Sequence, residues 1–457
     1  MKIISYILFT LISFIPAYAQ IHISGNVSGV LQDTTYIVDG YLRVLADDTL
    51  TIEPGSVFLF SGNYQLQTYG RLNCIGTEQD SIYFLPQESI PGWGCLSFDA
   101  NCDDLSQLSY CYIAGCLLAA INCYSDNITI SHCTIAGNFG TWGGGIYLND
   151  SHPVISHCQI YANTALSCGG GIYATHSNPL ISDCLLSGNH CDGLGSGMGG
   201  GGVCFNHYSN ASLTCCIIAN NTSGQFGGGI SCADNSNAEI RNCTIYGNFA
   251  DSSGAGIEIY YANPNILNNI IAGNIGEAAV NFDDSTTITI CYNDFYTNEN
   301  SDFGGNYPPD LGLLINTNVN GDSCDVYHNI YLNPQFYSIM GDSAFHLQAE
   351  SPCIDAGDPI SPPDPDSTIA DIGACYYDQT VVSPVINDLT ITIEGNDIIL
   401  QWTPVTNAVS YNIYLSTEAY FNLSGMIPIA SVSEPYYIDQ NALFANAFFY
   451  LATVVTE

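Results

Sequence analysis

Two histidines and an aspartate occupy the same slot of a repeated segment, each directly before a cysteine. They are His132, His157 and Asp183. If the repeats stack as strands about 4.8 Å apart, the two imidazoles and the carboxylate line one edge. Imidazole and carboxylate groups can hold a transition metal, so these three residues are candidate metal ligands. Later repeats carry cysteine and asparagine in this slot, which indicates that it is an ordinary turn position. We therefore assign no metal, catalytic or cofactor-binding residue.

Adjacent carboxylates occur at Asp103–Asp104 and Asp283–Asp284. A glycoside hydrolase needs two carboxylates that face each other across the substrate. Neighbours in a strand point to opposite faces, so these pairs favour turns over catalysis. The sequence also lacks a G-x-S-x-G elbow for a nucleophilic serine.

The charge is strongly one-sided, with 43 acidic and four basic residues. The basic residues are Lys2, Arg43, Arg71 and Arg241. A nucleic-acid partner requires several Lys or Arg contacts to phosphate, and an anionic membrane surface requires the same. Both partners are excluded, and acidic polysaccharides are disfavoured unless a cation bridges them. The acidity also keeps the protein soluble.

The first residues are typical of an export signal. Lys2 precedes an apolar run from Ile3 to Ile15, and Ala17-Tyr18-Ala19 provides small residues before a cut ahead of Gln20. No later stretch of about 20 apolar residues suggests a membrane span. We expect residues 1–19 to be removed, and the protein to be extracellular or at the cell surface rather than integral to the membrane.

A period of about 25 residues runs through the middle of the chain. A cysteine recurs with an apolar residue two positions later and an asparagine soon after, as in ISHCTIAGN and ISHCQIYAN. The cysteines are Cys111, Cys133, Cys158, Cys184, Cys216, Cys243 and Cys291, with Asn269 in the one missing place. A second motif, GGGIY, GGGGV or GAGI, interleaves with the first between Gly143 and Ile257.

Each period holds three short runs of alternating character separated by Asn, Gly, Ser and Pro. Such a unit cannot bury its own apolar face and must stack on its copies. The sequence predicts an all-β parallel β-helix, with the cysteine, apolar and GGGI isoleucine positions facing inward. The glycines allow tight turns and close approach of coils.

We expect the repeated cysteines to be mainly buried thiols that act as small apolar residues. Other cysteines are better disulfide candidates, although the pairing stays open. They are Cys168, Cys191, Cys204, Cys232 and the vicinal pair Cys215–Cys216.

These motifs resemble the passenger repeats of polymorphic outer-membrane proteins and, more widely, bacterial β-helix proteins with a pectate-lyase-like fold. The resemblance covers residues 105–300 and implies a right-handed parallel β-helix. The outer-membrane proteins are adhesins. The fold also includes polysaccharide lyases, which need an Arg or Lys base with calcium-binding carboxylates, yet Arg241 is the only basic residue of the repeats.

The segment at 301–378 resembles a choice-of-anchor module, through LNPQF, SPCIDAGDP and DIGACYY. Its residues Asp355, Asp358 and Asp371 favour turns, with Ca²⁺ as the ion that their oxygens could bind. Residues 383–457 resemble a fibronectin type III sandwich, with Trp402 and Tyr411 as matching core aromatics.

We thus expect a signal peptide at 1–19 and a β-helix at 20–378. The helix comprises an N-terminal cap at 20–104, regular repeats at 105–300 and the closing segment at 301–378. A small antiparallel sandwich at 383–457 follows. The sequence favours a non-catalytic role in adhesion, glycan binding or scaffolding. Neutral glycans are possible partners because the chain has 31 tyrosines that could contact them. Other surface proteins are the second kind of expected partner. The alternative is a carbohydrate-active enzyme, a lyase or a glycoside hydrolase, on the same fold.

Overall fold

The computed structural model describes residues 21–100, 102–125, 127–194, 199–283, 288–341, 343–380, 386, 388–405, 408–416, 428–440 and 449–455. The expected export signal at 1–19 lies outside them. The chain divides into two compact units, Met1–Tyr377 and Asp378–Glu457. The regular elements of the described residues are β-strands, without a helix.

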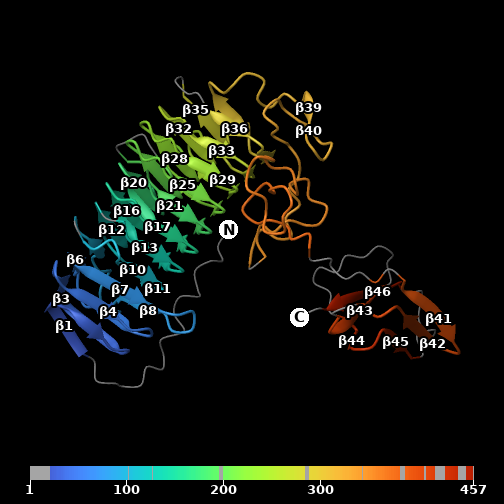
Figure 1. Cartoon of the computed structure of the whole chain (residues 1–457), viewed down its shortest axis with the longest axis horizontal. Helices are drawn as coiled ribbons and strands as arrows, with labels where there is room; N and C mark the ends of the chain where they lie inside the picture. The colour runs from blue at the N-terminus through green and yellow to red at the C-terminus, as the bar shows by residue number, and fades with distance from the viewer. Residues whose placement is uncertain are drawn as a thin grey trace. The chain divides into compact units, whose positions relative to one another are not determined.

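The first unit is a stack of coils, each of which places one short strand in each of three sheets (Figure 1). Sheet 1 contains β5 (Val57–Phe60), β8 (Ile82–Pro86), β11 (Cys111–Ala114), β14 (Thr134–Ala136), β18 (Gln159–Tyr161), β22 (Leu185–Ser187), β26 (Ile217–Ala219), β30 (Thr244–Tyr246), β34 (Ile270–Ala272) and β37 (Asp294–Tyr296). Sheet 2 contains β6 (Leu66–Thr68), β9 (Leu96–Phe98), β12 (Ile121–Tyr124), β16 (Ile146–Asn149), β20 (Ile172–Thr175), β24 (Val203–Asn206), β28 (Ile230–Ala233), β32 (Ile257–Tyr260), β35 (Val280–Phe282) and β38 (Phe303–Gly305). Sheet 3 contains β2 (Gly29–Leu31), β4 (Thr49–Ile52), β7 (Arg71–Ile75), β10 (Gln107–Ser109), β13 (Thr129–Ser131), β17 (Val154–Ser156), β21 (Leu180–Ser182), β25 (Ser212–Thr214), β29 (Glu239–Arg241), β33 (Asn265–Leu267) and β36 (Thr289–Cys291).

The remaining strands of this unit lie at its start, in its loops and near its end. The long strands β1 (Ile21–Asn26) and β3 (Thr35–Val44) join sheets 1 and 2 into one hydrogen-bonded sheet. Five short strands form a further sheet in the loops between sheets 1 and 2: β15 (Phe139–Trp142), β19 (Thr164–Cys168), β23 (His190–Cys191), β27 (Thr222–Ser223) and β31 (Phe249–Ala250). An antiparallel pair, β39 (Asn316–Thr317) and β40 (Ser323–Cys324), follows the last coil.

Neighbouring coils pair in parallel and in register. Ile113 pairs with Ile135, and Ile135 with Ile160, in sheet 1, while Ile146 pairs with Ile172 in sheet 2. These isoleucines are fully buried, because alternate residues of a strand face the interior. The predicted all-β parallel β-helix is confirmed.

The repeated cysteines form an interior column, with one correction. Cys158 and Cys184 are buried, and the backbone N–H of each donates to the sulfur of the next column cysteine at 3.4 Å. The sequence assignment of Cys291 to this column is wrong: Cys291 pairs with Leu267 and is only half-buried. Asn293 occupies the interior place instead, where its side chain accepts hydrogen bonds from the backbone and the side-chain amide of Asn269.

Asparagines form a second interior column. Asn163 is buried and donates from its side chain to the Ile135 carbonyl at 2.9 Å and to the Asn189 side chain at 3.0 Å. Its own side-chain oxygen accepts from the backbone and the side chain of Asn138. The same pattern recurs at Asn221, Asn248 and Asn274, and the column ends at Asn298, whose side chain donates to Asp302. Each amide thus satisfies buried polar groups of adjacent coils.

The glycine motif serves the close approach of coils. A Cβ on Gly170 would lie 2.4 Å from the Gly201 carbonyl oxygen and 2.5 Å from that of His190. No side chain fits in that space, so the predicted structural role of these glycines has a direct steric cause.

The structure carries its twenty cysteines as thiols, and all but three are buried. The off-column cysteines that the sequence favoured for disulfides are thiols too. Cys215 is exposed at the corner, whereas Cys216 faces the core, so the vicinal pair is divided between outside and inside.

The closing segment runs back along the flank of the coils, drawn in orange beside the green and yellow strands (Figure 1). Its residues Leu347, Cys353 and Ile372 share a buried cluster with Ile270 and Ala272 of β34. This contact buries the outer side of sheet 1 in the upper coils.

The second unit contains two antiparallel three-stranded sheets. One holds β41 (Thr390–Glu394), β42 (Asp397–Gln401) and β45 (Tyr436–Asp439), and the other β43 (Ser410–Ser416), β44 (Ala430–Val432) and β46 (Phe449–Val455). Trp402 and Tyr411 are buried with ring centroids 5.1 Å apart.

Candidate functional site

The three candidate metal ligands lie at one corner of the β-helix, between sheets 3 and 1. His132, His157 and Asp183 have φ angles of 53°, 54° and 54°, which is left-handed backbone. Each coil repeats this corner conformation, at Tyr110, His132, His157, Asp183, Cys215, Asn242, Asn268 and Tyr292. The chain bends here from one sheet to the next, so each corner side chain points outward.

The histidines stack rather than converge. The rings of His132 and His157 have centroids 4.8 Å apart and planes inclined by 8°. A nitrogen lone pair lies in the plane of its ring, so two parallel rings at this spacing cannot direct both lone pairs at one ion about 2.1 Å away. Among the described residues, no three His, Cys, Asp or Glu side chains are gathered for a metal.

The stack continues into the preceding coil at Tyr110, whose ring centroid lies 4.6 Å from that of His132. A second row of outward side chains runs beside it on sheet 1, where Tyr83, Tyr112, Thr134 and Gln159 are in register. We name these seven residues the tyrosine–histidine face: Tyr83, Tyr110, Tyr112, His132, Thr134, His157 and Gln159. They are exposed or half-buried.

The face offers phenol, imidazole, hydroxyl and amide groups and contains no charged carboxylate or ammonium group of its own. Asp183 adjoins its upper end. The sequence prediction missed its tyrosines. Tyr110 directly precedes Cys111, as His132 precedes Cys133, and this shared slot was the available signal.

The closing segment covers the continuation of the same surface. Asn242 donates from its side chain to the Asp371 carbonyl at 3.1 Å, and the Asn268 side-chain oxygen accepts from the Asp358 N–H at 2.8 Å. Thr244 accepts from the Ala374 N–H at 3.1 Å. Thr244 is therefore fully buried, whereas Gln159 in the same row is exposed. The tyrosine–histidine face is the part that this segment leaves open.

The adjacent carboxylates have separate structural roles. Asp103 pairs with Arg71 at 2.6 Å, and Asp104 accepts from the Asn127 N–H. Asp283 accepts from the Tyr261 N–H, while Asp284 lies outside the described residues. Asp103, Asp104 and Asp283 thus each stabilise local structure.

A buried carboxylate lies on the outer side of sheet 2. Glu258 is 5% exposed, and its Oε1 accepts from the Asn281 side chain at 3.0 Å. Its Oε2 and the Oγ of Ser231 lack hydrogen-bond partners within the described parts of the chain. Burial raises the pKa of Glu258 to about 8, so the group holds its proton at neutral pH.

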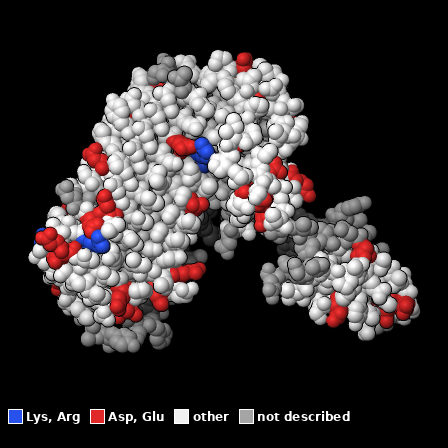
Figure 2. All heavy atoms as spheres, viewed as in Figure 1, with Lys and Arg blue, Asp and Glu red and all other residues white. Residues whose placement is uncertain are grey.

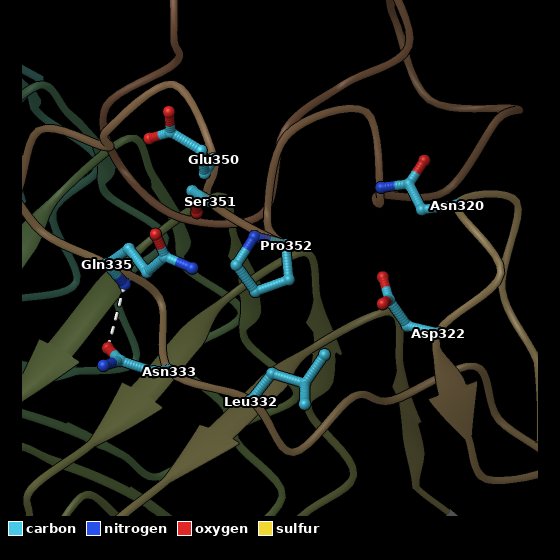
Figure 3. Close-up of a pocket in the computed structure, with 8 residues that line it drawn as sticks. All are labelled: Asn320, Asp322, Leu332, Asn333, Gln335, Glu350, Ser351 and Pro352. Atoms are coloured by element: carbon cyan, nitrogen blue, oxygen red, sulfur yellow. Dashed lines mark hydrogen bonds between the residues drawn. The ribbon is translucent and has the colours of Figure 1, made fainter.

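A hollow of about 510 Å³ lies in the closing segment (Figure 3). Asp322 and Glu350 both line it, but they lie on opposite sides of Pro352, and the Glu350 carboxylate is turned away from Asp322. The hollow therefore does not bring its two carboxylates together for general acid and base catalysis.

The calcium candidates organise turns of the closing segment. Asp371 accepts from the N–H groups of Asp355 and Tyr377, and Asp358 accepts from Ile360 N–H and the Ser361 hydroxyl. These bonds occupy oxygens that a calcium ion would need.

The basic groups leave little positive surface. Arg71 pairs with Asp103, Arg241 pairs with Glu239, and Arg43 contacts Gln67 and the Tyr41 ring. The side of the molecule drawn in Figure 2 carries sparse, scattered charges on a largely uncharged surface. No described helix is long and apolar enough to cross a bilayer.

The chain belongs to the right-handed β-helix family. The family model described as a right handed beta helix region matches residues 96–198 and 195–348. Among solved structures, the crystal structure of pectate lyase Pel9A is similar at 12% identity and a TM-score of 0.43, covering 76% of this chain and 87% of that one. No curated protein matches the chain.

Proposed function

We propose that this protein acts outside the cell as a non-catalytic β-helix that binds neutral glycans through the tyrosine–histidine face. The observation that carries the proposal is the double row of exposed and half-buried aromatic and polar side chains along the corner and the outer side of sheet 1. Aromatic rings provide apolar area, and phenol, imidazole and amide groups can bond to sugar hydroxyls. The lack of cationic groups favours an uncharged ligand.

Binding by the full chain to an array of neutral and acidic polysaccharides tests this function. We expect neutral glycans to bind and Tyr112→Ala to weaken the binding. Tyr337→Ala is the matched control, since Tyr337 is a 73% exposed tyrosine of the closing segment. An array without any glycan signal, or equal loss in both variants, would contradict the proposal.

A carbohydrate-active enzyme on the same fold is the second candidate, and Glu258 is the observation that favours it. A glycosidase acid needs a raised pKa and a second carboxylate across the substrate. Asn281 is the hydrogen-bond partner of Glu258, and the Asp283 carboxylate is near enough to contribute to its raised pKa. Release of reducing ends from a neutral polysaccharide, lost in Glu258→Gln, would establish this alternative over the first.

Export and the accessory module complete the proposal. Residues 1–19 act as a removable signal, so the exported protein should begin at Gln20 by N-terminal sequencing. The second unit acts as a fibronectin type III-like spacer, supported by its antiparallel strands and the packing of Trp402 on Tyr411. An intracellular, full-length product would contradict export.

A further inference from the structure

The recognition groups of the tyrosine–histidine face repeat once per coil. Tyr110, His132 and His157 follow one another along the axis with ring centroids 4.6 and 4.8 Å apart. Beside them, Tyr83 and Tyr112 are in register with centroids 5.8 Å apart. The two rows are parallel to the helix axis, because paired strands stack along it at about 4.8 Å.

The two rows differ in what they present. The rings of the corner row lie nearly parallel, at 19° and 8°, so their faces are turned to one another and their edges to solvent. That row offers one polar ring edge per coil for hydrogen bonds. Tyr83 and Tyr112 are inclined by 38° and leave apolar ring surface beside it.

The face ends where the chemistry of both rows changes. In sheet 1, Gln159 is followed in register by Leu185 and then Ile217. At the corner, His157 is followed by Asp183 and Cys215. The closing segment then covers the surface from Asn242 upward. From Tyr83 to Gln159 the sheet row spans four coils and three coil steps, or roughly 14 Å.

We propose that this face binds one unbranched, uncharged polysaccharide segment laid parallel to the helix axis, with successive sugars on successive coils. This inference rests on the proposed glycan binding and adds the ligand's shape, direction and length. An extended β-linked pyranose chain repeats at a spacing close to that of the coils. A polypeptide strand advances about 3.3 Å per residue and falls out of step with them.

Charge selects the same ligand. The face has no cation to neutralise an anionic sugar, and the chain carries a net charge of −39. The closing segment supports the choice of surface, because on the continuation of the same rows the side chains of Asn242, Asn268 and Thr244 already hold backbone groups of that segment.

Calorimetric titration of the full exported chain with neutral β-linked gluco-, manno- and xylo-oligosaccharides of increasing length tests the proposal. We expect affinity to rise with each added sugar and to level off at four or five units. His132→Asn and His157→Asn keep a residue that tolerates left-handed backbone but remove one ring each. Each should weaken binding of the pentamer about tenfold, as expected for loss of a hydrogen bond in a bound complex.

The outcomes distinguish failure of the axial arrangement from failure of glycan binding itself. Binding that does not strengthen beyond a disaccharide, or that prefers branched chains, overturns the axial arrangement but leaves glycan binding in place. Absence of binding to every oligosaccharide, or binding of an extended peptide instead, overturns both. Circular dichroism confirms that each variant is folded, and Tyr337→Ala should bind like the original protein.

Discussion

The carboxylate of Asp294 accepts a hydrogen bond from the thiol of Cys353 at 3.5 Å, although 59 residues separate them. Its other oxygen accepts from the Leu332 N–H at 3.0 Å. Asp294 belongs to β37 and Cys353 to the closing segment, so this buried contact fixes the segment to the coils.

The Asp294 contact predicts a pH-dependent stability. Burial raises the pKa of Asp294 to about 8, so the folded chain binds this proton more tightly than the unfolded chain. The stabilisation is complete below the ordinary aspartate pKa and is lost as the pH rises through about 8. Asp294→Asn should remove up to about 1.4 kcal/mol per pH unit of this dependence. Thermal unfolding between pH 5 and 9 measures it, with exposed Asp47→Asn as control; parallel curves for Asp294→Asn and the original protein would contradict it.

The asparagine column predicts a large cost for a small deletion. Asn163→Ala removes the partner of Asn138 and of the buried Ile135 carbonyl. Unsatisfied buried groups should lower the free energy of unfolding by about 2–4 kcal/mol. Asn178 also accepts a backbone N–H, from Asn210, but is exposed, so Asn178→Ala should cost less than about 0.5 kcal/mol. Denaturant titration compares them, and similar costs would show that burial is not the cause.

Two glycine substitutions distinguish lack of space from backbone strain. Gly170→Ala places a Cβ 2.4 Å from a backbone oxygen and should cost about 2–4 kcal/mol. Gly137 has a φ of +64° but nothing within 4 Å of its Cβ position, so Gly137→Ala should cost about 1 kcal/mol. Calorimetric unfolding of both variants measures which one loses more free energy of unfolding. A smaller loss in Gly170→Ala than in Gly137→Ala would refute the steric argument.

We expect the cysteine thiols to react little with alkylating reagents in the folded protein. Cys215 is exposed, Cys291 and Cys375 are half-buried, and the others are buried. Burial raises the pKa of Cys232 and of Cys215 to about 12, and the thiolate is the reactive form. Mass spectrometry after alkylation at pH 8 should show at most three modified sites in the native protein and twenty in denaturant. Fewer than twenty alkylated cysteines in denaturant without a reductant would show that some of them form disulfides.

Much of the β-helix was predictable, because inward residues obey a strict pattern. The Cys291 error arose from following residue type over that pattern. The residue two places after each column cysteine is apolar, but two places after Cys291 stands Asn293. Two places after Asn293 is the buried Phe295, and this test would have placed Asn293 inside.

The surface was harder to predict. His132 and His157 were correctly brought together on one edge, but the sequence did not show that their rings stack, since that depends on the left-handed corner. The docking of the closing segment has no periodic signal, and therefore neither the burial of Thr244 nor the limit of the open face could be predicted.

The asparagine column also restricts how such a molecule changes length. Each side-chain amide from Asn138 to Asn274 donates both to the column asparagine of the following coil and to a backbone carbonyl of the preceding coil, so the column joins three consecutive coils at every step. A deletion that removes one column asparagine interrupts this chain and leaves buried donors without partners, whereas removal or duplication of one entire coil restores it. Loops outside the column can vary in length, since neighbouring column asparagines lie 24 to 32 residues apart, but the column itself grows or shrinks only in whole coils, which would carry any repeated surface features with them.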